Sequence, residues 1–418
     1  MDSSTASQSI ELHGRHYQLP SRSVVVVCID GFDPEYLQAG CDNGILPTMS
    51  SWLKSGFHTT AKCAMPSLTN PNNLSIITGA PTSVHGVAGN YYLDKVTGEE
   101  HMLLDDSTMW GSTILAEMAD AGVRVAAITA KDKLRKIIGH GLFPSKGAIC
   151  FSAQKVRDCS LAEHGIAAVE EWLGRPAPDQ YSGDLSIFVL DAGIKLLQEK
   201  RADVFYLTLS DYIQHKHAPE SPESNDFMEK LDERLGELQR LGAVVAVTAD
   251  HGMSDKSGDD GKPSVLFLED HLNSKWPDSG VRVICPIADP FVKHHGALGG
   301  FVRVHLMKST ADVDEMLKEI RKLPQVELAL TGKAAAYELE MPLEREGDLV
   351  VIAKKGAAIG SRQSEHDLSH LESHRLRSHG GLSEQAVPLM KSTKLSSETG
   401  HEGKWWRNFD VFDLALNH

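Results

Sequence analysis

The chain has 418 residues, which is enough for one large domain with an insertion or for two domains. Its apolar fraction of 41% and charged fraction of 24% are typical of a soluble globular protein, and its net charge of -15 argues against a nucleic-acid surface, because phosphate contacts need clustered Lys and Arg. The N-terminal segment has no apolar stretch of signal-peptide length, and the longest apolar run, Val24–Ile29, is too short to span a bilayer. Six scattered cysteines without a Cys-x-x-Cys pair predict reduced thiols. We therefore expect a cytoplasmic protein.

The first candidate site residue follows the run Val24–Ile29. This β-branched run is long enough for a buried strand and too short for a helix, and it ends on Asp30-Gly31. An Asp-Gly pair after a strand is usually only turn chemistry. The carboxyl ends of parallel strands are also where α/β proteins bind ligands, so Asp30 is a candidate for a binding site as well.

A candidate nucleophile begins the next helical segment. Residues 66–79 predict a helix in which Thr69 or Asn70 is the N-cap and Gly79 is the C-terminal stop. This would place the Thr69 hydroxyl beside free backbone N–H groups at a positive helix end, where an anion can bind. A plain capping role is the alternative for Thr69. Further on, Asn90 lies in a glycine-containing turn.

Two lysines follow the next predicted strand. Residues 112–121 are expected to form a helix and Val123–Thr129 a strand, and Lys131 and Lys133 come directly after it. In an extended loop the two lysine side chains would point the same way. Two ammonium groups at a strand end usually mean a solvated turn, but here they would share a rim with the acids. Two amphipathic helices are then expected, Leu161–Trp172 and Ser186–Lys200.

A further strand is expected at Val204–Leu209, and it leads directly to two residues of metal-ligand type. Asp211 and His215 are four residues apart, which places both side chains on one face of a helical turn. His217 is close enough in sequence to be a rival for the same role.

The most informative stretch is a short strand that ends on a carboxylate and an imidazole. The long helix Ser224–Leu241 leads into the apolar run Val244–Val247, which stops at Asp250-His251. Neighbouring side chains at a strand end point in different directions, so these two residues could reach different corners of one site. A polar loop after a core strand is the alternative interpretation.

The pattern of the chain changes after Ser254, where several strands surround one predicted helix, Ala311–Leu323. These strands are expected at Val265–Phe267, Val281–Cys285, Phe301–Leu306, Val326–Leu330 and Asp348–Ala353. The predicted domains are the first part of a metal-binding α/β core at 22–262, an inserted α+β cap domain at 263–360, and a return to the core at 361–418. The histidine-rich run in that last part contains a further candidate ligand, His379.

Seven side chains from separate segments have the chemistry of a metal site. They are Asp30, Thr69, Asp211, His215, Asp250, His251 and His379. Three carboxylates, three imidazoles and a hydroxyl fit two Zn²⁺ ions with N and O ligands. Two divalent cations against three carboxylates would leave a positive site, able to hold a phosphoryl anion inside an acidic protein.

The order of these motifs resembles a known superfamily. The pattern is Asp30-Gly31, Thr69-Asn70, Asp211-x-x-x-His215, Asp250-His251-Gly252 and Ser378-His379-Gly380-Gly381. It is similar to the alkaline phosphatase superfamily, and within it to the nucleotide pyrophosphatase/phosphodiesterase branch. The resemblance implies an α/β core with a mostly parallel central sheet flanked by helices, plus the small inserted α+β cap domain. It also implies that one zinc ion is held by Asp30, Thr69, Asp250 and His251, and the other by Asp211, His215 and His379.

The resemblance also implies an activity. The segments Gly89-Asn90-Tyr91 and Ala130-Lys131-Asp132-Lys133 match members of this branch that cleave the P–C bond of phosphonoacetate to acetate and phosphate. Thr69 would be the nucleophile, forming a phospho-threonine, and Asn90 would stabilise the charge on the phosphorus oxygens. The residues implied to contact the substrate are Thr69, Asn90, Lys131, Lys133 and His215. The two lysines would pair with the substrate carboxylate.

Two alternatives stay open. A nucleotide pyrophosphatase/phosphodiesterase would need an aromatic slot for the base, and aromatic residues are only 6% of the chain. A non-catalytic metal-binding protein would not need to keep Thr69. The expected partner is a small-molecule phosphonate, with neither nucleic acid nor membrane, and a homodimer is compatible with the sequence.

Overall fold

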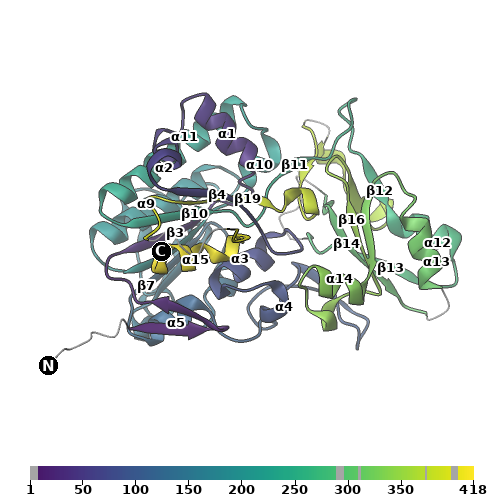
Figure 1. Cartoon of the computed structure of the whole chain (residues 1–418), viewed down its shortest axis with the longest axis horizontal. Coiled ribbons are helices and arrows are strands. Elements are labelled where there is room, and N and C mark those ends of the chain that lie inside the picture. The colour runs from purple at the N-terminus through teal and green to yellow at the C-terminus, as the bar shows by residue number, and fades with distance from the viewer. Residues whose placement is uncertain (1–7, 289–295, 309–311, 372–373, 397–402) are drawn as a thin grey trace.

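The computed structural model describes residues 8–288, 296–308, 312–371, 374–396 and 403–418, and its centre is a seven-stranded sheet (Figure 1). The strands run, from one edge to the other, in the order β4 Phe57–Lys62, β19 Ala386–Lys391, β10 Val244–Thr248, β3 Val24–Cys28, β9 Val204–Thr208, β7 Val125–Thr129 and β8 Ile149–Ser152. The five strands from β10 to β8 are parallel, and β19 is antiparallel to both of its neighbours. The predicted mostly parallel sheet is therefore confirmed.

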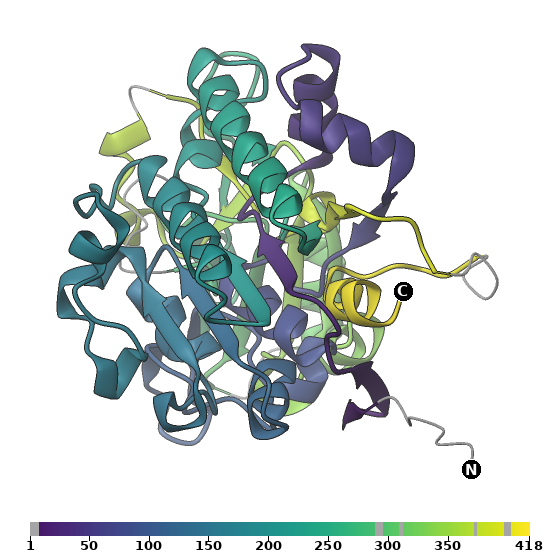
Figure 2. The ribbon, with the colours of Figure 1, turned by 90° about the vertical axis from the view of Figure 1, so that its left-hand side faces the viewer.

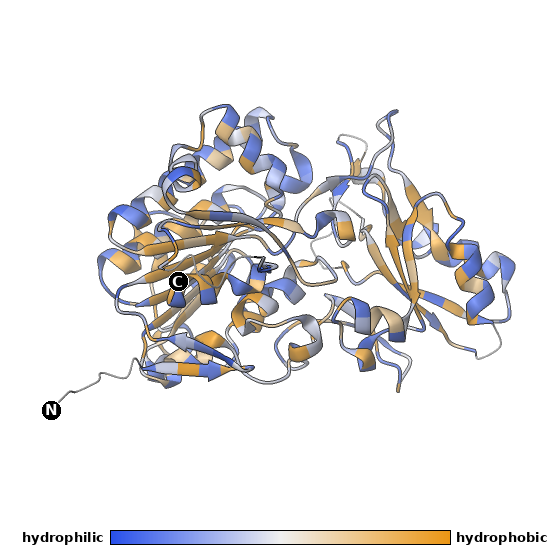
Figure 3. Cartoon of the chain, viewed as in Figure 1, coloured by the Kyte–Doolittle hydropathy of each residue, from blue (hydrophilic) through white to orange (hydrophobic). Residues whose placement is uncertain are grey.

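The parallel strands are short, mostly apolar runs of four or five residues. Every residue of β3, β7, β9 and β10 is buried, and most of the residues at the centre of the sheet are hydrophobic (Figure 3). The runs stop at the first polar residues, so the side chains that follow them lie at the edge of the core.

Helices cover both faces of this sheet. They are α1 Pro34–Asp42, α2 Pro47–Ser55, α3 Thr69–Thr78, α4 Thr82–His85, α5 Ile114–Asp120, α6 Asp132–Ile138, α7 Leu161–His164, α8 Val169–Leu173, α9 Asp184–Gln198, α10 Tyr212–Lys216, α11 Pro222–Arg240 and α15 Val411–Asn417. Helices α9 and α11 pack side by side on one face, and α15 packs against β3 and β10 on the other (Figure 2).

One predicted helix of this part is wrong. The single helix expected over Leu161–Trp172 is two short helices, α7 and α8. Gly165 ends α7 with a φ of 70°, and Ala168 has a φ of 50° before α8 begins. Both values are left-handed, and a continuous right-handed helix cannot pass through them.

A four-stranded antiparallel sheet forms the second part of the fold, on the right of Figure 1. Its strands run in the order β13 Val281–Ile284, β14 Phe301–Leu306, β16 Leu349–Ala353 and β15 Val326–Thr331. The accompanying helices are α12 Leu268–Lys275, α13 Val313–Ile320 and α14 Gly332–Glu338. The helix expected over Ala311–Leu323 is thus present as α13, although Ala311 itself lies outside the described residues, and the sequence interpretation missed α12 and α14.

Alternating residues of this sheet pack into two separate clusters. Val302, Val304 and Val351 pack with α12 and α13, and Phe301 and Ile352 pack with α14 on the opposite face. Both clusters are distinct from the large core around the seven-stranded sheet. This agrees with an α+β insertion, while the domain boundaries 22–262, 263–360 and 361–418 stay a prediction.

Short elements complete the fold. The two-stranded pairs are β1 Ser9–Leu12 with β2 Arg15–Gln18, β5 Tyr91–Leu93 with β6 Glu100–Met102, β11 Ser254–Asp255 with β18 Arg377–Ser378, and β12 Val265–Phe267 with β17 Ala358–Gly360. The 3₁₀ turns are Pro144–Lys146, Ala153–Asp158, Leu343–Arg345, Gln363–Glu365, Ser369–Leu371, Leu382–Glu384 and Asn408–Asp410. All six cysteines are unpaired, as predicted. Among the helices of the described residues, none combines the length and the apolar character needed to cross a membrane.

Candidate active site

Three of the candidate metal ligands come from three adjacent strands. Strand β3 lies between β10 and β9, and all three are parallel. Asp30 follows β3, Asp250 follows β10, and Asp211 follows β9 as the N-cap of α10. Because parallel strands share one carboxyl edge, the three carboxylates are delivered to the same place. All three are almost completely buried.

His251 is the centre of the first group of side chains. Its Nε2 lies 3.3 Å from Oδ1 of Asp30 and 3.8 Å from Oδ2 of Asp250. The same nitrogen lies 3.2 Å from the hydroxyl oxygen of Thr69. Asp30, Asp250 and His251 offer ligand atoms within 4.8 Å of one another, so a single metal ion could contact all three.

Asp211 is the centre of the second group. Its Oδ2 lies 2.9 Å from Nε2 of His215, one turn of α10 away, and 3.9 Å from Nε2 of His379. The His379 ring stacks on His251, with ring centroids 3.5 Å apart, so the two groups adjoin. Asp211, His251 and His379 form the second set of ligand atoms that could surround one ion. In that set His251 stands where the sequence interpretation has His215.

Hydrogen bonds fix the orientation of all three imidazoles. Nδ1 of His215 donates to the carbonyl oxygen of Arg377, Nδ1 of His251 to that of Gly252, and Nδ1 of His379 to that of Ser67, each at 2.8 Å. A carbonyl oxygen can only accept, so Nδ1 of each ring carries the hydrogen. A neutral ring held in this way presents the lone pair of Nε2 to the site, as a metal-ligating histidine does.

This arrangement fits a cation. Nε2 of His251 and Nε2 of His215 face carboxylate oxygens of Asp30 and Asp211. Both side-chain oxygens of Asp30 are buried and have no hydrogen-bond partner within the described residues. Buried acceptors that face one another are unfavourable unless a proton or a metal ion lies between them. The residues present therefore fit divalent metal ions that take N and O ligands.

The surroundings shift the pKa values of Asp30 and Asp211 in opposite directions. Burial, together with Asp211 and Asp250, raises the pKa of Asp30 well above its usual range. Burial alone would raise the pKa of Asp211 as well, but Lys131 and His215 hold it well below its usual range. Burial and the neighbouring imidazoles lower the pKa of His379, so this ring is neutral and can act as a ligand.

The position of Thr69 differs by one residue from the prediction. Leu68 is the N-cap of α3, Thr69 is its first residue, and Gly79 ends the helix in the left-handed conformation, as expected. Neither Thr69 nor Asn70 is the N-cap, and no side chain caps this helix. The Thr69 hydroxyl is thereby available to contact His251 instead of the backbone.

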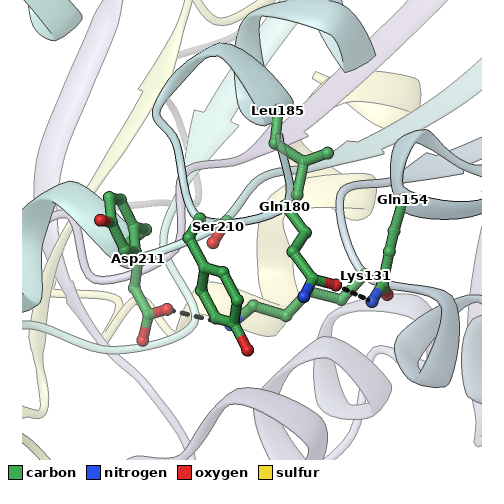
Figure 4. A pocket seen from close by; sticks show the side chains of 8 residues that line it. Lys131, Gln154, Gln180, Leu185, Ser210 and Asp211 are labelled. Carbon is green, nitrogen blue, oxygen red and sulfur yellow. Dashed lines mark hydrogen bonds and ion pairs between the residues drawn. The ribbon is translucent and has the colours of Figure 1, made fainter. Parts of the chain in front are cut away.

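Lys131 lies beside the second group. Its Nζ donates to Oδ1 of Asp211 at 3.1 Å, and it lines a small pocket with Gln154, Gln180, Tyr181 and others (Figure 4). The volume of this pocket is about 20 Å³, close to the space that a single water molecule occupies. A cationic side chain thus borders the candidate metal site on one side.

The predicted extended loop around the two lysines is wrong. Helix α6 begins at Asp132, with Lys131 as its N-cap, so Lys133 lies in the first helical turn. Residues two apart in a helix do not share a face, and Lys131 and Lys133 do not point the same way as they would in a strand. Asn90 is buried in a bend, and its side-chain oxygen has no hydrogen-bond partner within the described residues.

The sequence interpretation missed an asparagine, Asn73, that connects Thr69 to Asp250. The amide nitrogen of Asn73 donates to the carbonyl oxygen of Thr69 at 2.9 Å and to Oδ2 of Asp250 at 3.2 Å. Its amide oxygen accepts from the hydroxyls of Tyr206 and Thr208. Asn73 lies one helical turn after Thr69, and this spacing was the only signal in the sequence.

Arg377 is a second missed residue, and it positions His215. Its carbonyl oxygen holds Nδ1 of His215, and its Nε donates to the carbonyl oxygen of Gln214 at 2.8 Å. Its Nη2 lies 3.2 Å from the hydroxyl of Tyr36. The residue thus joins α10 to β18, the strand that leads to His379.

The sequence of the chain matches a known family over most of its length. Residues 24–382 match the family described as type I phosphodiesterase / nucleotide pyrophosphatase. The chain belongs to this family. The matched range contains all seven candidate metal ligands.

Individual members of the phosphodiesterase family are similar to this chain over shorter stretches. An uncharacterised pyrophosphatase/phosphodiesterase of Schizosaccharomyces pombe is 25% identical over 293 residues, which are 65% of this chain and 53% of that protein. A phosphonoacetate hydrolase of Penicillium oxalicum is 58% identical over 41 residues, which are 9% of this chain and 57% of that protein. The chain therefore spans little more than half the length of these two relatives.

Solved structures are similar over nearly the whole chain. Two crystal structures of phosphonoacetate hydrolase from Sinorhizobium meliloti 1021, one in complex with phosphonoformate and one with phosphonoacetate, are 43% identical in sequence with a TM-score of 0.94. Each match covers 98% of this chain and 99% of that one. Murine ectonucleotide pyrophosphatase / phosphodiesterase 5, with 17% identity and a TM-score of 0.61, shares the fold.

These comparisons confirm two predictions from the sequence. The resemblance to the nucleotide pyrophosphatase/phosphodiesterase branch is correct, and the fold is the expected alkaline-phosphatase-like α/β fold. The roles of the individual residues, including the metal ligands, Thr69, Asn90 and the two lysines, stay predictions.

Proposed function

We propose that this chain is a metal-dependent phosphonoacetate hydrolase that cleaves the P–C bond to release acetate and phosphate. The main support is the 43% identity, over 98% of the chain, to a phosphonoacetate hydrolase whose structure was solved with phosphonoacetate bound. The geometry of the site agrees, because a hydroxyl, two groups of metal-ligand atoms and a lysine adjoin one another.

Two Zn²⁺ ions are the cofactors in this proposal. Asp30, Thr69, Asp250 and His251 would hold one ion, and Asp211, His215 and His379 the other. When bound, such ions favour the alkoxide form of a hydroxyl and neutralise the oxygens of a phosphonate. The close approach of His251 to Asp211 and His379 makes His251 a neighbour of both ions.

Thr69 is the nucleophile in this proposal. Its oxygen forms a bond to phosphorus as the P–C bond breaks, and the electron pair of that bond moves to the substrate carbon. The backbone N–H of Thr69 and the side-chain amide of Asn90 would stabilise the charge on the phosphorus oxygens. Protonation of the carbon gives acetate, and attack of water on the phospho-threonine then releases phosphate and regenerates the hydroxyl.

The difficulty of this reaction lies in its carbon leaving group. In phosphonoacetate the adjacent carboxylate can take up the developing charge as an enediolate-like species. Lys131, which borders the site beside Asp211, can pair with that carboxylate, and Lys133 is the second candidate. A phosphate ester has no such carboxylate, which is why the lysines favour the phosphonate.

A nucleotide phosphodiesterase is the second candidate, because one observation favours it. Tyr181 and Tyr212 line the pocket beside Lys131, with ring centroids 6.4 Å apart, and aromatic side chains can hold a base. The pocket volume of about 20 Å³ argues against this, since it fits a water molecule but not a nucleobase. Tyr181 would have to move to admit a nucleotide.

A comparison of two substrates tests the proposal. Zinc-loaded protein should release phosphate from phosphonoacetate with a kcat/KM at least 100-fold above that for a nitrophenyl ester of a nucleotide. The reverse order would make the chain a nucleotide phosphodiesterase. Turnover of neither substrate, with both metal ions bound, would support a non-catalytic metal-binding protein.

A further inference from the structure

A second pocket lies at the opposite end of β3 and β10 from the candidate metal site. Its volume is about 820 Å³, and its wall includes Val24 and Val244, the first residues of these two strands. Asp30 and Asp250 follow the other ends of the same strands. At about 3.3 Å per residue, five residues of strand separate the two places by roughly 17 Å. We call this second cavity the basic pocket.

The side chains of the basic pocket carry positive charge only. The charged ones are Arg22, Lys391 and Lys394, and none of the described residues in the wall is Asp or Glu. His418 also lines the pocket, but its Nε2 lies 3.6 Å from a carboxylate oxygen of Asp413. The whole chain has 57 acidic residues against 42 Lys and Arg. The basic pocket therefore differs in sign of charge from the protein as a whole, which is acidic. Its positive electrostatic potential favours the binding of anions.

Three side chains of the basic pocket have no partner among the described residues. Within the described part of the chain, the side chains of Arg22, Lys391 and Lys394 make neither a hydrogen bond nor an ion pair. Lys391 is only 2% exposed, and burial together with Arg22 lowers its pKa to about 8. A buried ammonium group without a partner is unfavourable unless an anion neutralises it.

We propose that the basic pocket binds a small phosphorylated anion. The volume lies within the range of about 300–1,000 Å³ that is usual for small-molecule sites. Leu19, Val24 and Val244 supply an apolar wall for the body of the ligand, while Lys391 and Arg22 face its charged group. The concave shape favours a small molecule over an extended polyanion. This site does not depend on the proposed hydrolase activity.

Binding of methylenediphosphonate, measured by isothermal titration calorimetry on the metal-loaded protein, tests this proposal. This probe has no carboxylate, so the proposed hydrolysis does not consume it. The parent should show one class of sites beyond the metal centre. The double variant Arg22→Gln/Lys394→Gln, which changes two exposed residues, and the single variant Lys391→Met should each weaken that class at least tenfold. The matched control Lys318→Gln/Lys322→Gln removes the same charge in and just after α13 and should leave probe binding unaltered.

Turnover of phosphonoacetate gives the second readout, because none of these variants changes a residue of the candidate active site. Unchanged kcat with lost probe binding would assign the anion to the basic pocket. Equal binding in the parent and both pocket variants would overturn the proposal. A second result would also overturn it: a single-stranded DNA 20-mer binds through Arg22 and Lys394, and the diphosphonate shows no second class of sites. The surface would then be a nucleic-acid site.

Discussion

The hydroxyl oxygen of Thr69 lies 3.2 Å from Nε2 of His251. The hydrogen of the His251 ring is on Nδ1, which donates to the carbonyl oxygen of Gly252. In the neutral ring Nε2 is therefore an acceptor, to which the Thr69 hydroxyl can donate. A metal ion on Nε2 would replace this hydrogen and meet the same hydroxyl oxygen. The contact agrees with the proposed role of Thr69 as a nucleophile that a metal ion would activate.

Replacing Thr69 by alanine should abolish turnover. Loss of a nucleophile typically reduces kcat by more than about 10³-fold, whereas the metal ions keep their other ligands. We expect Thr69→Ala to bind phosphonoacetate and both metal ions but to release no phosphate, and Thr69→Ser to retain part of the activity. Thr60→Ala, on the exposed side of β4, is the matched control. Phosphate release at the parental rate by Thr69→Ala would exclude the phospho-threonine route.

Removal of metal should destabilise the protein as well as inactivate it. Without a cation, the oxygens of Asp30 stay buried and unpaired, and the Nε2 lone pairs face carboxylates. At a free concentration 100 times its Kd, a bound ion adds about 2.7 kcal/mol to the free energy of unfolding. We expect a chelator to lower Tm and activity together, and Zn²⁺ to restore both. Elemental analysis should find two ions per chain; one ion per chain would contradict the proposed ligand sets.

Lys131 should contribute mainly to substrate binding. We expect Lys131→Ala to raise KM for phosphonoacetate by about 10- to 100-fold, since a charge-assisted hydrogen bond contributes about 1.5–3 kcal/mol. Lys133→Ala tests the second lysine in the same assay, and Lys136→Ala, exposed on the same helix, is the control. Unchanged kinetics in both Lys131→Ala and Lys133→Ala would mean that the carboxylate is held elsewhere.

The sequence predicts the convergence of the carboxylates for a simple physical reason. β3, β9 and β10 are continuous apolar runs, such runs form buried parallel strands, and each one stops at a carboxylate. Since parallel strands end at a common edge, and β10, β3 and β9 are adjacent, Asp30, Asp211 and Asp250 meet there. Local pattern alone predicts that the three carboxylates share this edge.

Other features of the site depend on contacts that no local pattern encodes. The side-chain oxygen of Gln154 accepts from the backbone N–H of Asp132 at 2.9 Å, at the start of α6. Gln154 lies in the 3₁₀ turn Ala153–Asp158, which follows β8. Asn73 reaches Asp250 across 177 positions of sequence. Such long-range partners place Lys133 in a helical turn and add Asn73 to the site, and neither effect could be predicted from the sequence.

Lys391 should make stability depend on pH in the alkaline range. Burial lowers its pKa from 10.5 to about 8, so between these values the unfolded chain binds a proton that the folded chain does not. The cost of burying the charge is therefore complete below about pH 8 and disappears as the pH rises towards 10.5. We expect Lys391→Met to raise the free energy of urea unfolding at pH 7, with a gain that shrinks above pH 8. Lys394→Met, at an exposed position, should show no such trend.

A buried ion pair should anchor the turn that follows His379. Nζ of Lys256 lies 2.8 Å from Oε1 of Glu384, both side chains are fully buried, and Oε2 of Glu384 accepts from the backbone N–H of Gly381 at 3.0 Å. Removing one partner of a buried pair typically costs about 3–5 kcal/mol, because the other charge is left unpaired. We expect Lys256→Met to lower the free energy of urea unfolding by that amount, and Lys256→Met/Glu384→Met to lower it by less. The Gly381 turn loses its acceptor only when Glu384 is changed, so the double variant should also weaken zinc binding through His379. Equal destabilisation by the single and the double variant would show that the two charges do not interact.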